Sequence, residues 1–203
     1  MIAGVVLAAG RSRRMGTPKA LLRTGDESFV ARARRGLREG GCDPLVVVVG
    51  TDGSADRIEA EAARARAHVA VNAIPESEQI DSVRTALHTL GDEVRAAVVL
   101  PVDVPRVSAD TVRALIAAFA EGEPPIVLPT LRGDHGHPVL FGRAIWDELS
   151  SHPHPQGARS VIDAHREEVR EVAVDDEGVV HDVNTPAELR ELRDGGGWAA
   201  ESG

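Results

Sequence analysis

Apolar runs and amphipathic stretches alternate along the whole chain. The runs are short, rich in Val, Ile and Leu, and bounded by glycine, proline or charged residues, which is typical of buried strands. Between them, apolar residues recur roughly every three or four positions, as on one face of a helix. The pattern predicts strands at 2–8, 45–49, 68–72, 96–100, 126–128 and 139–141, and helices at 28–39, 55–67, 80–90, 108–121, 161–168 and 185–193.

Continuous apolar strands that alternate with helices indicate one mostly parallel sheet with helices on both faces. We therefore predict an α/β fold, a single-domain, Rossmann-like three-layer sandwich. Residues 1–194 are expected to form this domain, and the glycine-rich residues 195–203 a flexible tail. Ligands of such sheets bind at the carboxyl ends of the strands. Gly10, Asn72 and Asp103 each follow or end a predicted strand, so we expect them at one edge of the sheet.

Residues 5–22 join a predicted buried strand to a cationic loop. The apolar run ends at Gly10, and the loop that follows holds Gly16, three arginines and Lys19. Glycines let backbone N–H groups approach phosphate oxygens, and Arg and Lys neutralise them. The spacing is neither that of a P-loop nor that of the Gly-x-Gly-x-x-Gly fingerprint. On its own, the loop fits either a phosphate site or a strand-to-helix turn with solvated arginines.

Composition narrows the class of ligand. The chain carries a formal net charge of -9, so a single cationic loop favours a small anionic ligand over a nucleic-acid track. Aromatic residues make up 2% of the chain, which argues against stacking platforms for single-stranded nucleic acid. Cys42 is the sole cysteine, as expected in a reducing compartment, and no signal peptide or membrane span is evident. We predict a cytoplasmic protein that binds neither nucleic acid nor membranes.

Three short motifs in the first loop carry a family resemblance. The sequences Leu7-Ala8-Ala9-Gly10, Arg14-Met15-Gly16 and Pro18-Lys19 resemble the signature of nucleotidyltransferases of the molybdenum cofactor cytidylyltransferase and guanylyltransferase type. These enzymes have the nucleotide-diphospho-sugar transferase fold. The resemblance implies catalytic roles for Arg14 and Lys19, and nucleotide contacts from Leu7, Ala8, Ala9, Gly10, Arg11, Ser12 and Lys19.

Two further segments suggest a magnesium site. Asp103 stands at a predicted strand end between prolines, where its carboxylate could coordinate Mg²⁺ or simply cap a turn. The resemblance favours the metal, because this segment is similar to the family's metal-binding aspartate motif. Asn184 precedes Thr185-Pro186 where the family places its second ligand. Its amide brings no charge, and Asp182 is a nearby carboxylate.

The remaining resemblance concerns the substrates. Asn72 and Ser82 lie in segments that are similar to those near the base and ribose, although Glu78 replaces a glycine that is usual in the family. His137, in a Gly-His-Pro element, and Arg159, in a Gly-Ala-Arg element, imply an acceptor site. From the residues alone, His137 could equally fix a turn by hydrogen bonding.

The implied reaction is transfer of a nucleoside monophosphate from a triphosphate to a phosphorylated acceptor, with Mg²⁺ as cofactor. Ala9 narrows the base slot and favours CTP, and the resemblance favours molybdopterin as acceptor, with a molybdoenzyme as a further partner. The alternatives are a GTP-using or sugar-phosphate transferase of the same fold and a non-catalytic nucleotide-binding accessory protein. A nicotinamide oxidoreductase is disfavoured because the dinucleotide fingerprint is missing.

Overall fold

A computed structural model describes residues 1–10, 17–51, 55–63, 67–151 and 154–194. One sheet of eight strands runs through the molecule in the order β10-β7-β9-β6-β1-β4-β5, with β8 paired to β7, and β2 and β3 form a separate hairpin. The strands are β1 (Ile2–Leu7), β2 (Arg23–Thr24), β3 (Glu27–Ser28), β4 (Leu45–Val49), β5 (His68–Val71), β6 (Ala96–Pro101), β7 (Ile126–Leu131), β8 (Asp134–His135), β9 (Val139–Gly142) and β10 (Val169–Ala173). The sheet is mostly parallel, and β9 runs antiparallel to both β6 and β7.

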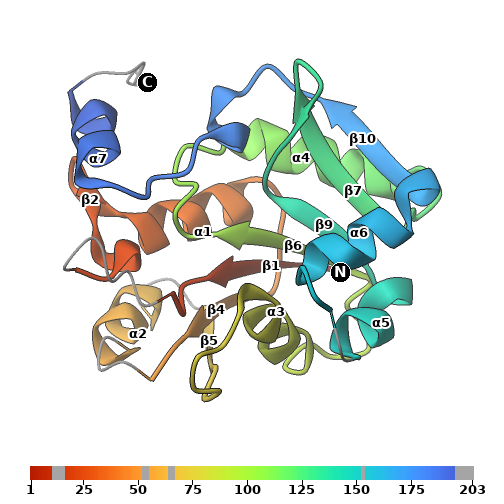
Figure 1. Cartoon of the computed structure of the whole chain (residues 1–203), viewed down its shortest axis with the longest axis horizontal. Helices are drawn as coiled ribbons and strands as arrows, with labels where there is room; N and C mark the ends of the chain where they lie inside the picture. Colours follow the sequence, from red (N-terminus) through yellow and green to blue (C-terminus); the bar gives the residue numbers. More distant parts are fainter. Residues whose placement is uncertain (11–16, 52–54, 64–66, 152–153, 195–203) are drawn as a thin grey trace.

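Helices cover both faces of this sheet, as the pattern predicts (Figure 1). The α-helices are α1 (Phe29–Glu39), α2 (Ala55–Ala63), α3 (Gln79–Leu87), α4 (Ala109–Ala120), α5 (Trp146–Ser150), α6 (Ala158–Ala164) and α7 (Pro186–Arg193). Short 3-10 turns lie at η1 (Lys19–Leu21), η2 (Arg143–Ile145), η3 (Arg166–Glu168) and η4 (Glu177–Val180). None of the helices described in these ranges is long and apolar enough to cross a membrane.

Two apolar cores lie on opposite faces of the sheet. Side chains alternate between the faces along each strand, so Val6 of β1 joins one core while Val5 joins the other. The first core contains residues of α1, α2, α4 and α7, and the second contains residues of α3, α5 and α6. This confirms the predicted three-layer α/β sandwich.

Three helices begin beside capping residues at the positions where the sequence predicts helix starts, 28, 108 and 185. Ser28 Oγ accepts a hydrogen bond from Ala31 N at 3.3 Å, and Ser108 Oγ accepts one from Thr111 N at 3.1 Å. Before α7, Thr185 Oγ1 accepts from the Glu188 amide, and Glu188 Oε2 accepts from the Thr185 amide. This reciprocal capping box fixes the chain that leads into α7, which includes Asn184.

Elements of the C-terminal third differ from the sequence prediction. The helix predicted at 161–168 begins at Ala158 and ends at Ala164, and the next strand, β10, was not predicted. The strand is at the edge of the sheet, where Arg170 and Glu171 face solvent, so its sequence lacks the apolar run of a central strand. The short helix α5 and the hairpin β2–β3 were also missed. The predicted tail, 195–203, lies outside the described residues.

Candidate functional site

The carboxyl ends of the central parallel strands meet at one edge of the sheet. Gly10 follows β1, Asn72 follows β5 and Asp103 follows β6, as expected. Arg11, Ser12 and Arg14 belong to the stretch 11–16, outside the described residues, so their roles stay predictions. The described remainder of the loop places Lys19 at the start of η1.

The turn after β1 is held by the two neighbouring strands. The Ala8 amide donates to the Val48 carbonyl at 2.8 Å, and the Val102 amide donates to the Leu7 carbonyl at 3.1 Å. The backbone of Ala9 lies close to Gly50, where an added Cβ would be 3.1 Å from the Ala9 carbonyl oxygen. Leu7 and Ala8 are buried, Ala9 is half-buried and Gly10 is exposed. The predicted phosphate loop therefore starts from a fixed backbone.

Lys19 brings together the two predicted metal ligands. Its ammonium donates to Asp103 Oδ2 at 2.8 Å and to Asn184 Oδ1 at 2.5 Å. The side chains of Lys19 and Asp103 are 15% and 27% exposed, so water only partly screens this pair. Asn184 is oriented by other contacts, since its amide nitrogen donates to Asp182 and its backbone N–H donates to Glu188 Oε2. The Val183 amide also donates to the Asp103 carbonyl at 2.8 Å, which joins the two segments.

The donor set fits a hard divalent cation that takes most of its ligands from elsewhere. The described part of the chain holds no group of three His, Cys, Asp or Glu side chains that could bind a metal. A carboxylate oxygen of Asp103 and an amide oxygen of Asn184 nevertheless face one point, which the Lys19 ammonium takes. Mg²⁺ is usually bound by one or two carboxylates, substrate phosphates and water. Asp103 and Asn184 are suited to such a site.

Asn72 and Ser82 form a buried pair beneath the loop that follows β5. Asn72 Nδ2 donates to Ser82 Oγ at 3.0 Å, and Asn72 Oδ1 accepts from the Ile74 amide at 3.1 Å. Both residues are almost fully buried, with 3% and 4% of their surface exposed. The pair therefore shapes the loop that carries Ile74, and direct contact of either side chain with a nucleotide stays a prediction.

The start of α3 is fixed by charged groups. Asp81 accepts from the Glu78 amide through Oδ2 and from Arg84 Nη1 through Oδ1, both at 2.9 Å. Arg84, itself buried, also donates to the Leu149 carbonyl at 2.9 Å and to the Ser151 carbonyl at 2.6 Å. Arg84 thus joins α3 to the end of α5. The side chain of Glu78 is exposed at the N-cap of α3 and lines the cavity described next.

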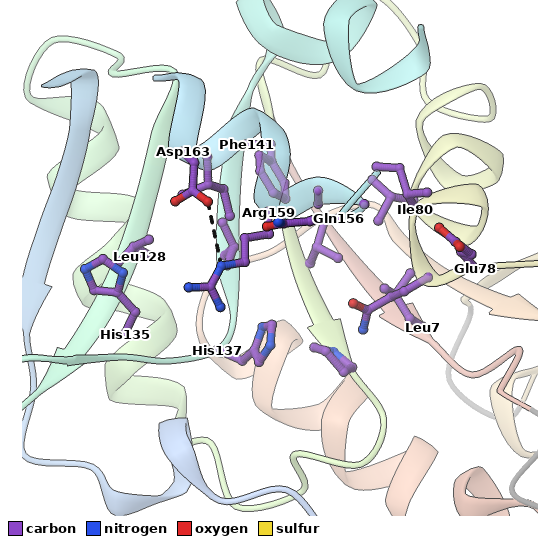
Figure 2. A pocket seen from close by; sticks show the side chains of 18 of the residues that line it. Leu7, Glu78, Ile80, Leu128, His135, His137, Phe141, Gln156, Arg159 and Asp163 are labelled. Carbon is purple, nitrogen blue, oxygen red and sulfur yellow. Dashed lines mark ion pairs between the residues drawn. The ribbon is translucent and has the colours of Figure 1, made fainter. Parts of the chain in front are cut away.

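Two adjoining cavities lie beside these groups. The larger measures about 580 Å³, and the smaller, about 440 Å³, includes Asp103 and Asp182 in its wall. Figure 2 shows the larger cavity, with Leu7 and Ile80 on one side and Arg159 reaching in from α6. Both cavities are lined by Gln79, Pro101, His135, Gly136 and His137. A ligand could therefore extend from the Asp103 carboxylate to the Arg159 guanidinium.

His137 stands in the shared wall. Its backbone N–H donates to the Val179 carbonyl at 2.8 Å, and among the described groups its buried Nδ1 has no hydrogen-bond partner. Burial lowers the pKa of His137, against the opposing effect of Asp103 and Asp182, so the neutral imidazole is favoured. The bond to Val179 is made by the backbone, so it does not decide between a turn-fixing side chain and an acceptor contact, and the side chain faces the predicted acceptor space (Figure 2).

Arg159 lies at the mouth of the larger cavity. Its side chain is 77% exposed, and its Nε is 3.7 Å from Asp163 Oδ2, as the dashed line in Figure 2 marks. Arg166 also lines this cavity, and the sequence does not predict it, because a run of charged residues such as 166–171 is typical of a solvated surface. Gly136 was not singled out either. An added Cβ there would be 2.6 Å from the Val179 carbonyl, so only glycine permits this approach.

A glycine turn after the first strand, a carboxylate at the end of β6 and a cationic side chain between them define an α/β nucleotidyltransferase. The chain belongs to the family with a MobA-like NTP transferase domain, whose sequence profile matches residues 4–169. It is therefore an enzyme of the nucleotidyltransferase class, and enzymes of this fold generally use divalent metals.

Related proteins cover most of the chain. The crystal structure of Rv0371c from Mycobacterium tuberculosis H37Rv is 33% identical, with a TM-score of 0.83 over 95% of this chain and 97% of that one. A structure of Rv0371c in complex with manganese has a TM-score of 0.79 at 29% identity, over 95% and 97% of the two chains. The 2-C-methyl-D-erythritol 4-phosphate cytidylyltransferase of Frankia casuarinae is 29% identical over 193 residues, which are 91% of this chain and 71% of that protein. A probable molybdenum cofactor guanylyltransferase of Opitutus terrae is 53% identical over 47 residues, 23% of each chain.

Proposed function

We propose that the protein transfers a cytidine monophosphate group from CTP to the phosphate of molybdopterin, with Mg²⁺ as cofactor and pyrophosphate as the leaving group. The observation that carries this proposal is the meeting of Lys19, Asp103 and Asn184 beside two adjoining cavities. A cation site at one end and a cavity with arginines at the other suit two anionic substrates in a row. The product would then pass to a molybdoenzyme.

The mechanism needs alignment and charge neutralisation more than acid–base catalysis. The acceptor phosphate is already ionised at neutral pH, so an oxygen of it can attack the α-phosphorus while the bond to pyrophosphate breaks. Lys19 and Arg14 would stabilise the negative charge that develops on the departing pyrophosphate. Asp103 and Asn184 would hold Mg²⁺, which when bound neutralises phosphate oxygens. Arg159 and His137 would orient the acceptor.

The preference for CTP rests on Ala9. The backbone of Ala9 lies against Gly50, and we expect its methyl group to narrow the base slot and leave less room for a purine. The Frankia casuarinae relative is a cytidylyltransferase, which is consistent with this preference. The relative from Opitutus terrae is named as a guanylyltransferase, so GTP is the second candidate.

The proposal for the acceptor rests on the larger cavity. It measures about 580 Å³, within the range of small-molecule sites. Arg159 and Arg166 line it together with the carboxylates of Glu78 and Asp163, and an anionic acceptor would compete with Asp163 for the two guanidinium groups. One relative is named for 2-C-methyl-D-erythritol 4-phosphate and another for the molybdenum cofactor. The first of these acceptors is a phosphate ester, and molybdopterin is the acceptor that the Gly-His-Pro and Gly-Ala-Arg elements favour.

Pyrophosphate release tests this proposal directly. The protein would be incubated with Mg²⁺, one of CTP, GTP, ATP or UTP, and either molybdopterin or 2-C-methyl-D-erythritol 4-phosphate. We expect release with CTP and molybdopterin only. Thermal unfolding with each triphosphate measures binding separately, because a ligand at about 100 times its Kd adds roughly 2.7 kcal/mol of stability. Pyrophosphate release with GTP would overturn the base assignment. Pyrophosphate release with 2-C-methyl-D-erythritol 4-phosphate would overturn the acceptor assignment.

A further inference from the structure

The position taken by Lys19 is that of a cation between two oxygen ligands. Its ammonium donates to Asp103 Oδ2 and to Asn184 Oδ1, at 2.8 and 2.5 Å. These two residues lie 84 and 165 positions away along the chain. The Asn184 amide is oriented without help from Lys19, through its contacts with Asp182 and Glu188. A backbone bond from the Val183 amide to the Asp103 carbonyl holds the two segments together, so both residues stay next to this point if the ammonium leaves it.

The choice of residue at position 19 fits this position. Lys19 is the only lysine among the 23 lysine and arginine residues of the chain. Arginine has a wide planar fork, whereas the lysine ammonium is a compact point charge on a flexible stem. A compact charge can fill a space sized for a small ion, and the flexible stem allows it to leave.

A divalent cation and the Lys19 ammonium cannot share the two oxygens. The Asp103 carboxylate and the neutral Asn184 amide supply one formal negative charge at the position that the Lys19 ammonium takes, and Asp182 adds a carboxylate bonded to the Asn184 amide nitrogen. Two cations a few ångströms apart repel strongly where water is largely excluded, and Lys19 is only 15% exposed. Lys19 must therefore move before Asp103 and Asn184 can bind a metal.

We propose that Lys19 is a displaceable occupant of the metal position, whose ammonium leaves Asp103 and Asn184 for the phosphates when metal and triphosphate bind together. This inference rests on the proposed function, since the triphosphate supplies the new partner for the ammonium. Because the two events share one side chain, triphosphate binding strengthens metal binding and metal binding strengthens triphosphate binding by the same factor. Metal alone binds weakly, and the enzyme collects it with the nucleotide.

Binding of Mn²⁺ alone tests the first half of this exchange. Free Mn²⁺ can be measured by electron paramagnetic resonance in titrations of nucleotide-free protein. Lys19→Met should bind Mn²⁺ about tenfold more tightly than the native protein, a coupling of ordinary size. Arg23→Met is the matched control, because it removes the same charge from a side chain that is 51% exposed and pairs with Glu61, and it should change the Kd less than about twofold. The double variant Lys19→Met, Asp103→Asn should lose the gain.

The single lysine also permits a direct observation of the second half of the exchange, in which the Lys19 ammonium moves to the phosphates. Selective isotope labelling of lysine gives one side-chain signal in a nuclear magnetic resonance spectrum, which belongs to Lys19. Addition of Mg²⁺ with CTP should shift this signal, while the same Mg²⁺ concentration alone should leave most of it in place. A signal that keeps its position when Mg²⁺ and CTP are both bound would contradict the exchange.

The results separate the two proposals. If Lys19→Met binds Mn²⁺ as tightly as the native protein does, and the native protein releases pyrophosphate, the exchange is overturned and the proposed function stands. Tighter Mn²⁺ binding in Lys19→Met, with no pyrophosphate release by native protein from any triphosphate and acceptor, would overturn the proposed function and leave the role of Lys19 in the metal position. Weaker Mn²⁺ binding in Lys19→Met would show that lysine supports the metal, the reverse of this inference.

Discussion

The two ends of the site differ in how their charges are satisfied. At the phosphate end, Lys19 and Asp103 neutralise each other, and their side chains are 15% and 27% exposed. At the acceptor end, the Arg159 side chain is 77% exposed, with a carboxylate no nearer than 3.7 Å in its ion pair with Asp163. The His137 Nδ1 atom is buried, and no group in the described part of the chain bonds to it.

This difference shows which interactions each ligand must replace and which it can add. A ligand at the phosphate end has to take over contacts that the chain already makes to itself, so binding there is an exchange. A ligand at the acceptor end meets an exposed guanidinium in a long ion pair, so its contact there replaces mainly water and only a weak contact within the protein. The phosphate end should therefore govern turnover, and the acceptor end should govern affinity for the second substrate.

The largest expected effect is at the phosphate end. Asp103→Asn removes the negative charge that Lys19 Nζ contacts at 2.8 Å, while it keeps the shape of the side chain. We expect turnover to fall about 1,000-fold, the effect of losing a charged group that acts on the transition state. The half-exposed position of Asp103 should leave the melting temperature nearly unchanged.

The matched control for Asp103→Asn is Asp134→Asn. Asp134 lines the same smaller cavity from the exposed strand β8, so its substitution by Asn changes the charge by the same amount at the edge of the site. Pyrophosphate release should stay within about twofold of native, the effect of a screened surface charge. Equal losses in the two variants would mean that overall charge, and not the contact with Lys19, controls turnover.

The second effect is on the wall that holds the acceptor end in place. Arg84→Met leaves the Leu149 and Ser151 carbonyls without their donor and takes a cation away from Asp81. Loss of one partner in a buried charged network costs about 2–4 kcal/mol of unfolding free energy. Urea denaturation measures this. Arg113→Met, which breaks an exposed pair with Asp110, should cost less than about 1 kcal/mol.

The third effect tests the acceptor end itself. Arg159→Met should raise the KM for the acceptor that supports turnover about tenfold, because an exposed guanidinium gives a charge-assisted contact to an anion. The KM for the triphosphate should change little, as expected for an interaction made with the second substrate alone. Arg170→Met is the control, since Arg170 lies on the edge strand β10 and pairs there with Glu121 of the α4 C-cap. A larger rise in the KM for the triphosphate would reverse the assignment of the two ends.

The sequence predicts most of the sheet and the phosphate end because both follow from local patterns. Apolar runs mark the central strands, and the residues at their carboxyl ends must meet at one edge. Asp103 is predicted as a site residue from its place at a strand end, and the predicted helix starts at 108 and 185 coincide with Ser108 and Thr185, whose side chains cap these helices. Such features need only the neighbouring few residues.

The missed features depend on contacts across the fold. Nothing around Arg84 in the sequence reveals that it bonds to carbonyls at the end of α5, more than 60 positions away. Strand β10 lies at the edge of the sheet and pairs with one neighbouring strand, β7, so its sequence has the charged residues of a surface and lacks the apolar run of a central strand. The meeting of Lys19 with both Asp103 and Asn184 likewise joins three distant segments. Local patterns thus locate the site, and the fold decides which side chains complete it.

The smallest expected effect is a pH-dependent contact that supports the acceptor end. His165, just after α6, bonds to Glu148 Oε2 at 2.7 Å and to Glu168 Oε1 at 2.9 Å. These carboxylates raise the pKa of His165 above its usual value near 6.5, so the folded protein holds the proton more tightly than the unfolded chain does. The stabilisation is complete below that usual pKa and is lost as the pH rises through the raised value.

Urea denaturation measures this contribution. The unfolding free energy of the native protein should exceed that of His165→Gln by about 0.2–1 kcal/mol at pH 5.5, the size of an exposed ion pair, and by less at pH 8.5. A difference for His165→Gln that is the same at the two pH values would mean that its imidazole bonds to these glutamates without a change of charge.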